Sequence, residues 1–372
     1  MFLGTINKNS CGFPQKSIYS YLGYFYFQRS IPMYPQQFMS TKRLKIAYYR
    51  AGEKNAAKLL LLHGNLSSSV FFLPLFPILS KYFDIAAPDF RCFGDTEDLP
   101  IDATRGYRDW SDDLDAFLDG LGWDCFAIAG WSMGGNIAMQ YAIDHTERIT
   151  KLIFIAPGSP FGFGGTKDET GTPLYPPGLA SGGGCANPQV IMAVSSSRLL
   201  LRQTLNAFYF HPPFRMNREW EDRLLESISK TKIGKDKYPG NYNFSYKWPF
   251  VTAGDKGVLN AMSPQYGNLT SITQIKPKPP ILWIRGSHDV IVSDNSMFEF
   301  GYLGKSGIVP GWPGSFLLPP QPMVTQTRHV LNQYKENGGT CNELVLPGGH
   351  ACFLEAPQMF VSAVRSFLSE GR

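Results

Sequence analysis

The stretch GWSMGG, residues 130 to 135, places a serine between glycines, directly after an apolar run and directly before a helical pattern. A strand that turns abruptly into a helix needs small residues on both sides of the turn, because the backbone there is strained. The residue at the apex, Ser132, is then exposed on a rigid turn. A serine held in this way is well placed to act as a nucleophile if a base, an acid and an oxyanion hole lie nearby.

Three other segments could supply those groups, and each follows or ends a strand-like run. The segment IRGSHDVIV, residues 284 to 292, delivers Asp289 after a glycine. The segment LVLPGGHACFLEAP, residues 344 to 357, delivers His350 after two glycines. The segment HGNL, residues 63 to 66, offers backbone N–H groups. The functional groups therefore follow one another in the chain order Ser, Asp, His.

Strand-like and helical patterns alternate around these segments. Strands are expected at residues 44–50, 58–64, 83–89, 125–129, 149–156 and 279–286, and helices at 69–79, 104–121 and 136–142. This alternation predicts an α/β fold, a mostly parallel sheet flanked by helices. Reactive groups on such a sheet lie at the carboxyl ends of the strands, which is where the four segments stand.

The alternation lapses between Pro157 and Lys278, where a Gly-rich segment precedes helical patterns near residues 190–210 and 218–230. The Gly-rich segment is not a phosphate loop, because no Lys-Ser or Lys-Thr follows a G-x-x-x-x-G. A long insertion between two core strands is typical of a lid that carries binding function. The expected organisation is an N-terminal extension of residues 1–43, disordered or lying on the surface, a core of residues 44–157 and 277–372, and a helical lid of residues 158–276.

With these elements the sequence resembles the α/β-hydrolase fold family, of the serine hydrolase or esterase type with a large lid insertion. The resemblance rests on G-x-S-x-G, strand-Gly-x-x-Asp and Gly-His-x-x-x-x-Glu-x-Pro in the family's order, and it covers about residues 44 to 157 and 277 to 372. It implies that Ser132 is the nucleophile, His350 the general base and then acid, and Asp289 the carboxylate that orients the imidazole. It also implies an oxyanion hole made of the N–H groups of Met133 and Asn65.

Other assignments stay open at the acid and the base. Asp294 or Asp255 could replace Asp289 as the acid, although only Asp289 follows a strand and a glycine. His63 is expected to support the oxyanion loop, and the histidines other than His350 lack its strand-Gly-Gly context.

The expected substrate contacts are Trp131, Asn65 and Leu66. Packing is the alternative for Trp131, and holding its own loop is the alternative for the Asn65 side chain. Glu355 is expected to cap or orient the last helix.

Two features depart from the family's usual pattern. The connection from Asp289 to His350 is long, because it contains a Pro/Gly-rich segment, residues 301–322, that forms either a second wall of the pocket mouth or a surface elaboration. In the run DFRCFGDT, residues 89–96, Cys92 stands where glycine is common and Thr96 where serine is common. The cysteine is expected to alter the path of the loop without touching the chemistry.

Composition excludes several classes of protein. A chain of 372 residues with 43% hydrophobic and 17% charged residues is globular. A net charge of +5 without clustered Lys or Arg argues against nucleic acid as a partner. The six cysteines show no metal-ligand spacing, so neither a metal nor a cofactor is expected. Reduced thiols indicate a cytoplasmic protein, with a Cys341–Cys352 bridge left open.

The first 52 residues contain no Asp or Glu and include an aromatic patch at residues 19–27. The patch is too polar and too short for a membrane span, so stable membrane insertion is not expected. The segment is interpreted as an extension, or as sequence upstream of a true start at Met33 or Met39, with an organellar transit peptide as the alternative.

The leading hypothesis is a serine hydrolase that cleaves a carboxylic ester or lactone of a small, apolar substrate through an acyl-enzyme. Serine at the nucleophile position disfavours the dehalogenase and epoxide hydrolase chemistry that uses aspartate there. The alternatives are a non-catalytic ligand receptor on the same scaffold and a lipase that acts at lipid interfaces. The sequence leaves the oligomeric state open.

Overall fold

The computed structural model of the protein describes residues 33–175 and 179–370. Most of the expected N-terminal extension, and the aromatic patch within it, lies outside these residues. The sheet begins earlier than expected, because strand β1 (Gln37–Ser40) falls inside the range assigned to the extension. β1 pairs antiparallel with β2 (Lys45–Ala51) at the edge of the sheet.

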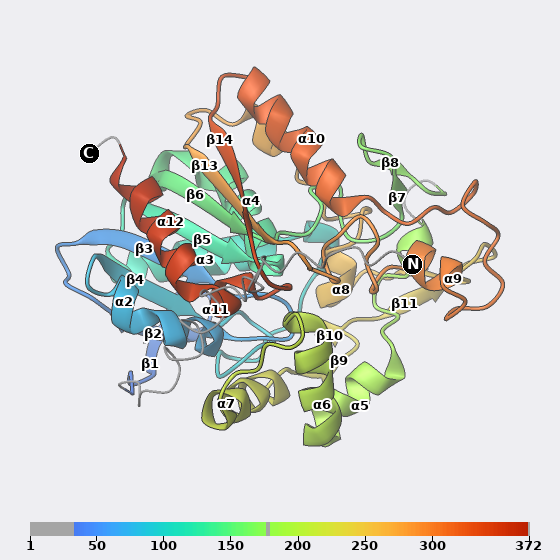
Figure 1. The fold of residues 1–372 in the computed structure, drawn as a ribbon, viewed down its shortest axis with the longest axis horizontal. Coiled ribbons are helices and arrows are strands. Elements are labelled where there is room, and N and C mark those ends of the chain that lie inside the picture. Colours follow the sequence, from blue (N-terminus) through green and yellow to red (C-terminus); the bar gives the residue numbers. More distant parts are fainter. Residues whose placement is uncertain (1–32, 176–178, 371–372) are drawn as a thin grey trace, which may run out of the picture.

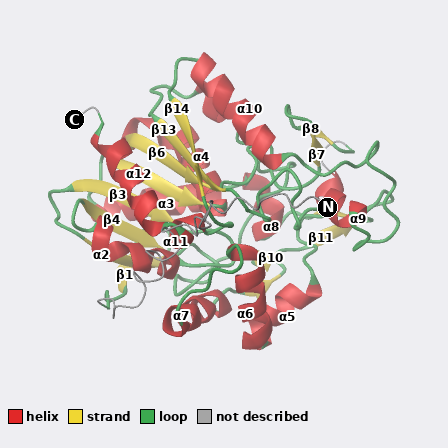
Figure 2. Cartoon of the chain, viewed as in Figure 1, coloured by secondary structure: helices red, strands yellow, loops and turns green. Residues whose placement is uncertain are grey.

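One sheet of eight strands organises the molecule (Figures 1 and 2). The strand order is β1-β2-β4-β3-β5-β6-β13-β14. β2 runs antiparallel to β4, and every pair from β4 to β14 is parallel. These strands are β3 (Ala57–Leu62), β4 (Phe83–Pro88), β5 (Phe126–Trp131), β6 (Ile149–Ile155), β13 (Ile281–Gly286) and β14 (Cys341–Leu346). The predicted mostly parallel sheet is confirmed. The carboxyl ends of its parallel strands all lie at the same end of the sheet.

Helices cover both faces of this sheet (Figure 1). α3 (Arg108–Leu121) and α4 (Met133–His145) pack against each other on one face. On the other face lie η1 (Ser69–Leu75), α2 (Phe76–Leu79), α11 (Cys352–Glu355) and α12 (Pro357–Ser369). Aromatic rings join the elements of that face, since Phe353 stacks on Phe72 at 5.2 Å and contacts Phe360. Short turns η2 (Ala103–Arg105) and η3 (Thr146–Arg148) precede α3 and β6.

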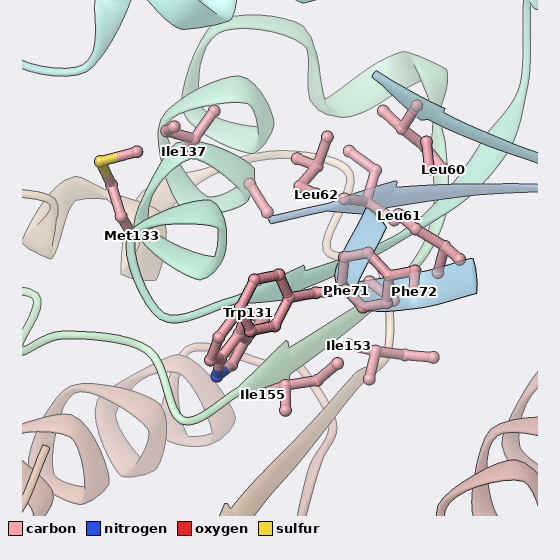
Figure 3. Close-up of a cluster of buried hydrophobic side chains, with 14 of the residues drawn as sticks. Leu60, Leu61, Leu62, Phe71, Phe72, Trp131, Met133, Ile137, Ile153 and Ile155 are labelled. Atoms are coloured by element: carbon pink, nitrogen blue, oxygen red, sulfur yellow. The ribbon is translucent and has the colours of Figure 1, made fainter. Parts of the chain in front are cut away.

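The core lies between these layers. All six residues of β4 and of β5 are buried, as expected for strands covered on both faces. Figure 3 shows Trp131, the last residue of β5, among Phe71, Phe72 and Ile155. The strand that carries the serine turn is therefore rigidly anchored by packing.

Two insertions interrupt this alternation. The first occupies residues 156–280, slightly longer than the expected lid. Its elements are β7 (Thr166–Lys167), β8 (Thr172–Pro173), η4 (Leu179–Ser181), α5 (Pro188–Ser196), α6 (Arg198–Thr204), the π-helical turn η5 (Leu205–Tyr209), α7 (Arg218–Ser229), β9 (Ile233–Gly234), β10 (Tyr238–Pro239), β11 (Tyr242–Phe244), β12 (Val251–Ala253), α8 (Val258–Ala261) and η6 (Thr270–Gln274). The second insertion, residues 287–340, contains α9 (Phe300–Lys305) and α10 (Met323–Glu336).

None of the helices in the described part of the chain combines the length and the apolarity that a membrane crossing requires. The five cysteines in that part are free, so Cys341 and Cys352 do not form the bridge that the sequence left open.

Candidate active site

Ser132 occupies the sharp turn between β5 and α4. Its backbone angles, φ 56° and ψ −125°, lie in a region that non-glycine residues rarely adopt, so the turn is strained. The flanking glycines are required by close backbone contacts. A Cβ at Gly130 would come within 2.2 Å of the Gly134 carbonyl oxygen, and a Cβ at Gly134 within 2.4 Å of the carbonyl oxygens of Leu62 and His63. The predicted strand–turn–helix around the serine is therefore present.

The HGNL loop lies directly against this turn. Gly64 is so close to Ser132 that a Cβ on the glycine would come within 2.9 Å of the serine Cβ. Met133 is the first residue of α4, and the first N–H groups of a helix have no partner within it. The N–H of Asn65 makes no hydrogen bond within the described residues. The two expected oxyanion donors thus come from segments that meet at the serine.

His63 holds the HGNL loop from within the core. Its Nε2 accepts a hydrogen bond from the backbone N–H of Phe90 at 3.0 Å, which places the ring proton on Nδ1. Nδ1 in turn donates to the Gly64 carbonyl at 2.8 Å, and the Ser67 hydroxyl donates to the same carbonyl. Burial lowers the pKa of His63 to about 3, so the ring stays neutral. Its contacts match the structural role expected from the sequence.

The imidazole of His350 and the carboxylate of Asp289 are in contact, although 61 residues separate them. Nδ1 of His350 lies 2.8 Å from Oδ2 of Asp289. The other carboxylate oxygen accepts hydrogen bonds from the backbone N–H groups of Ile291 and Val292, at 2.8 and 2.9 Å. These bonds fix the carboxylate and direct Nδ1–H toward it, so Nε2 carries the lone pair.

Trp131 connects the serine turn to the histidine loop. Its indole Nε1 donates to the His350 backbone carbonyl at 2.9 Å, and its ring lies 5.3 Å from the imidazole.

Ser132, Asp289 and His350 are all nearly enclosed, with 9%, 8% and 2% of their surfaces exposed. Within the described residues, no hydrogen bond joins the Ser132 hydroxyl to His350. Catalytic hydrogen bonds often tighten only in the substrate complex.

The alternative acids have other partners. Asp294 accepts hydrogen bonds from the backbone N–H groups of Val324 and Thr325 and so caps α10. Asp255 accepts a hydrogen bond from the Asn241 side chain at an exposed position. Asp289 is the carboxylate that His350 contacts.

The expected substrate contacts differ in their surroundings. Trp131 is fully buried and its only polar atom is bonded, so in this structure it packs rather than facing a pocket. Asn65 is half-buried, its Oδ1 has no hydrogen-bond partner in the described part of the chain, and its side chain interacts with Tyr238. Leu66 is nearly buried and has a positive φ of 46°.

One residue that the sequence did not identify, Tyr209, links the first insertion to this site. Tyr209 donates from its hydroxyl to the carbonyls of Asn65 and Leu66, at 3.2 and 3.0 Å, and its own carbonyl accepts from the Ala351 N–H. Its ring contacts both Trp131 and His350. A buried tyrosine in a helical run gives no local signal of such a role.

Glu355 does not cap the last helix, so the capping role, one of the two expected from sequence, is wrong. The helix α12 has no side-chain cap, and Glu355 instead accepts from the backbone N–H groups of Gly349 and His211 at 2.6 and 2.9 Å. Burial raises the pKa of Glu355 to about 7, against the opposing effect of these two hydrogen bonds. The His211 imidazole stacks on His288 with ring centroids 3.9 Å apart. The first insertion is thus bonded to the loop that carries His350.

The atypical residues of the DFRCFGDT run fit the backbone that they occupy. Cys92 has a φ of 71°, which explains why glycine would suit this position. The Thr96 hydroxyl donates to the Asp89 carbonyl at 2.7 Å and accepts from the Ala47 N–H at 3.0 Å, as a serine hydroxyl could. Neither residue is among the groups that contact Ser132 or His350.

Comparison with known proteins agrees with the fold. A family model described as alpha/beta hydrolase fold matches residues 58–300. The carboxylesterase YbfK of Bacillus subtilis is 28% identical over 140 residues, 36% of this chain and 47% of that protein. The pimeloyl-[acyl-carrier protein] methyl ester esterase of Legionella pneumophila is 36% identical over 97 residues, 26% of this chain and 36% of that protein. The matched stretches thus span less than half of these relatives.

Solved structures share the fold across nearly the whole chain. The crystal structure of carboxylesterase CesB (YbfK) from Bacillus subtilis superposes with a TM-score of 0.56 at 18% identity, covering 95% of this chain and 97% of that one. The enol-lactonase from Burkholderia xenovorans LB400 has a TM-score of 0.55 at 16% identity, covering 90% and 100%. At such identities the likeness establishes fold alone. With the sheet order, the serine turn and the family match in agreement, this chain belongs to the α/β-hydrolase fold family.

Proposed function

We propose that this protein is a serine hydrolase that cleaves a carboxylic ester or lactone of a small, apolar substrate through an acyl-enzyme. The observation that carries the proposal is the 2.8 Å contact between Nδ1 of His350 and Asp289, together with the strained turn of Ser132, whose neighbour Trp131 donates to the His350 carbonyl. With Nδ1–H committed to the carboxylate, Nε2 is the atom able to take a proton from the Ser132 hydroxyl. The names of carboxylesterases among the relatives also support an ester substrate.

The reaction has two stages in this proposal. The Ser132 oxygen attacks the substrate carbonyl carbon while His350 takes the hydroxyl proton, and the carbonyl oxygen becomes an oxyanion. The N–H groups of Met133 and Asn65 stabilise that oxyanion. His350 then gives its proton to the departing alkoxide, which leaves the acyl group on Ser132. Water, deprotonated by His350, then attacks the acyl carbon. His350 returns this proton to the Ser132 oxygen as the C–O bond to the serine breaks, which releases the acid and the free serine.

The first insertion acts as the lid in this proposal. The three reacting side chains are nearly enclosed, and the aromatic ring of Tyr209 contacts both Trp131 and His350. Exclusion of water strengthens the electrostatic interactions that stabilise the oxyanion. An enclosure bounded by aromatic rings favours a small, apolar acyl group.

The test is hydrolysis of a panel of p-nitrophenyl esters, lactones and amides by the purified full chain and by Ser132→Ala. We expect turnover of at least one ester or lactone and its loss in the variant, with unchanged substrate affinity. A ligand receptor on this scaffold would bind members of the panel without turning any over, and that result would reject the proposal.

A further inference from the structure

Two segments of the insertions share an unusual composition. The hairpin β11–β12, residues 242–253, and the segment of residues 300–322 contain no Asp or Glu, and each contains one lysine, Lys247 and Lys305. Both are rich in aromatic and aliphatic side chains. The first belongs to the insertion after β6 and the second to the insertion after β13, so neither is part of the sheet that carries Ser132.

A small hydrophobic cluster, separate from the main core, holds the two segments together. Trp248, at the turn of the hairpin, donates from Nε1 to the Pro310 carbonyl at 2.9 Å and packs edge-on against Phe300 at 6.0 Å. Leu318 is buried in the same cluster, and Trp312 packs against it. Figure 1 shows β11 and α9 near each other, at the end of the molecule away from the C-terminus. The two segments therefore form one continuous region.

The side chains around this cluster face solvent although they are apolar. Phe316 is 93% exposed, Phe244 85% and Tyr246 83%. Four more apolar side chains of the two segments are exposed as well: Tyr242, Phe250, Ile308 and Leu317. Single exposed apolar residues are ordinary, but a group of this size on one region of a protein marks an interaction surface. We call these seven residues the aromatic face.

The charges beside the aromatic face indicate the kind of partner that it binds. Lys247 lies over the rings of Tyr175 and Tyr246, at 4.3 and 5.6 Å from their centroids, and Lys305 is exposed at the end of α9. The two segments themselves carry two lysines and no carboxylate, and a net positive charge attracts an anionic surface. Exposed phenylalanine and tyrosine side chains, with a lysine on each segment, suit the boundary between lipid headgroups and acyl chains, where apolar rings are buried and cations meet lipid phosphates.

We propose that the aromatic face docks the protein on the surface of a bilayer that contains anionic phospholipid. The contact is interfacial: the rings enter the headgroup region and no element crosses the bilayer. Docking does not require the hydrolase activity, so it can be measured on Ser132→Ala as well as on the unmodified chain. Failure of the proposed hydrolysis and failure of docking are therefore separate results.

The experiment is co-sedimentation of the full chain with vesicles of phosphatidylcholine alone and of phosphatidylcholine mixed with phosphatidylserine. The test variant combines Phe244→Ser, Tyr246→Ser and Phe316→Ser. The control variant combines Met33→Ser, Met192→Ser and Leu199→Ser, which removes three exposed apolar side chains elsewhere. Because all six side chains are exposed, both variants should keep the thermal midpoint of the unmodified chain.

We expect binding to the mixed vesicles that weakens with salt, about 10-fold or more weaker binding by the test variant, and unchanged binding by the control variant. Equal binding by the test variant, or no vesicle binding by the unmodified chain, would overturn the proposal. A dimer of the unmodified chain that the test variant loses, without vesicle binding, would also overturn it and assign the face to a second copy.

Discussion

The Tyr209 hydroxyl donates hydrogen bonds to the two backbone carbonyls on either side of the positive φ of Leu66. This residue of the first insertion therefore stabilises a strained conformation in the HGNL loop, which carries Asn65, one of the two proposed oxyanion donors. One side chain of the insertion thus couples it to the HGNL loop.

Tyr209→Phe removes these hydrogen bonds and keeps the ring. Because the Asn65 N–H loses its precise placement, we expect kcat on a soluble ester to fall about 10-fold or more, with little change in KM. The apparent pKa of activity should not move, since the His350–Asp289 contact is untouched. Tyr334→Phe is the matched control, because its buried hydroxyl donates to the Pro279 carbonyl at 2.7 Å, just before the start of β13 and so at the opposite end of that strand from Asp289. Equal loss of kcat in both variants would contradict a positioning role for Tyr209.

Asp289→Asn should lower kcat by about 10²- to 10⁴-fold, because an amide cannot both accept from the two backbone N–H groups and hold Nδ1–H of His350 as a carboxylate does. Steady-state kinetics with a p-nitrophenyl ester measures this. Asp294→Asn is the control: its carboxylate caps α10, so stability should fall while kcat is kept. A larger loss of kcat in Asp294→Asn than in Asp289→Asn would show that Asp294, and not Asp289, is the acid.

Gly134→Ala should prevent correct folding of the serine turn, because its Cβ would lie 2.4 Å from two backbone carbonyl oxygens. Backbone atoms of β3 and of the HGNL loop cannot move away cheaply, so we expect a loss of several degrees or more in thermal midpoint and loss of activity. Gly234→Ala serves for comparison, since the nearest atom to its Cβ would be at 3.4 Å. If Gly134→Ala unfolded at the same temperature as the unmodified chain, the expected clash between its Cβ and the two carbonyl oxygens would be wrong.

The free energy of unfolding should depend on pH through Glu299. Burial raises its pKa to about 7, despite hydrogen bonds from the backbone N–H groups of Tyr302 and Gly301, whereas the unfolded carboxyl titrates near 4.5. Between these values the folded chain holds a proton that the unfolded chain has released. The contribution of Glu299 to the free energy of unfolding is therefore fully present below about pH 4.5. It declines as the pH rises to about 7, by an amount on the order of 3 kcal/mol.

The measurement is denaturant unfolding of the unmodified chain and of Glu299→Gln across that range. The substitution changes the free energy of unfolding by a constant amount at every pH, because an amide offers fewer acceptors. The test is therefore how the difference between the two proteins varies with pH. The stability of the unmodified chain relative to Glu299→Gln should fall from pH 4.5 to 7 and then level off. A relative stability that rises with pH would contradict the direction of the pKa shift.

The residues at the strand ends could be predicted because each follows an apolar run and a glycine. That local pattern located Ser132, Asp289 and His350, and the parallel sheet brings their segments to one edge. Strand β1 was missed since it is a short edge strand with half-exposed residues, which gives little periodicity.

The contacts of the first insertion could not be predicted. Tyr209 and Glu355 act over 143 and 144 residues of sequence, through a hydroxyl to Leu66 and a carboxylate to the His211 N–H. No local spacing encodes such pairs. Trp131 was ambiguous for another reason: an aromatic residue beside a nucleophile suits packing and pocket lining equally, and only its burial decides.

The most direct test of the central claim is labelling with a fluorophosphonate, followed by intact mass measurement and peptide mapping. The account predicts one covalent adduct on Ser132, lost in Ser132→Ala and formed much more slowly in His350→Ala, with all three proteins folded. An unlabelled native chain, or an adduct on another residue that persists in Ser132→Ala, would contradict it.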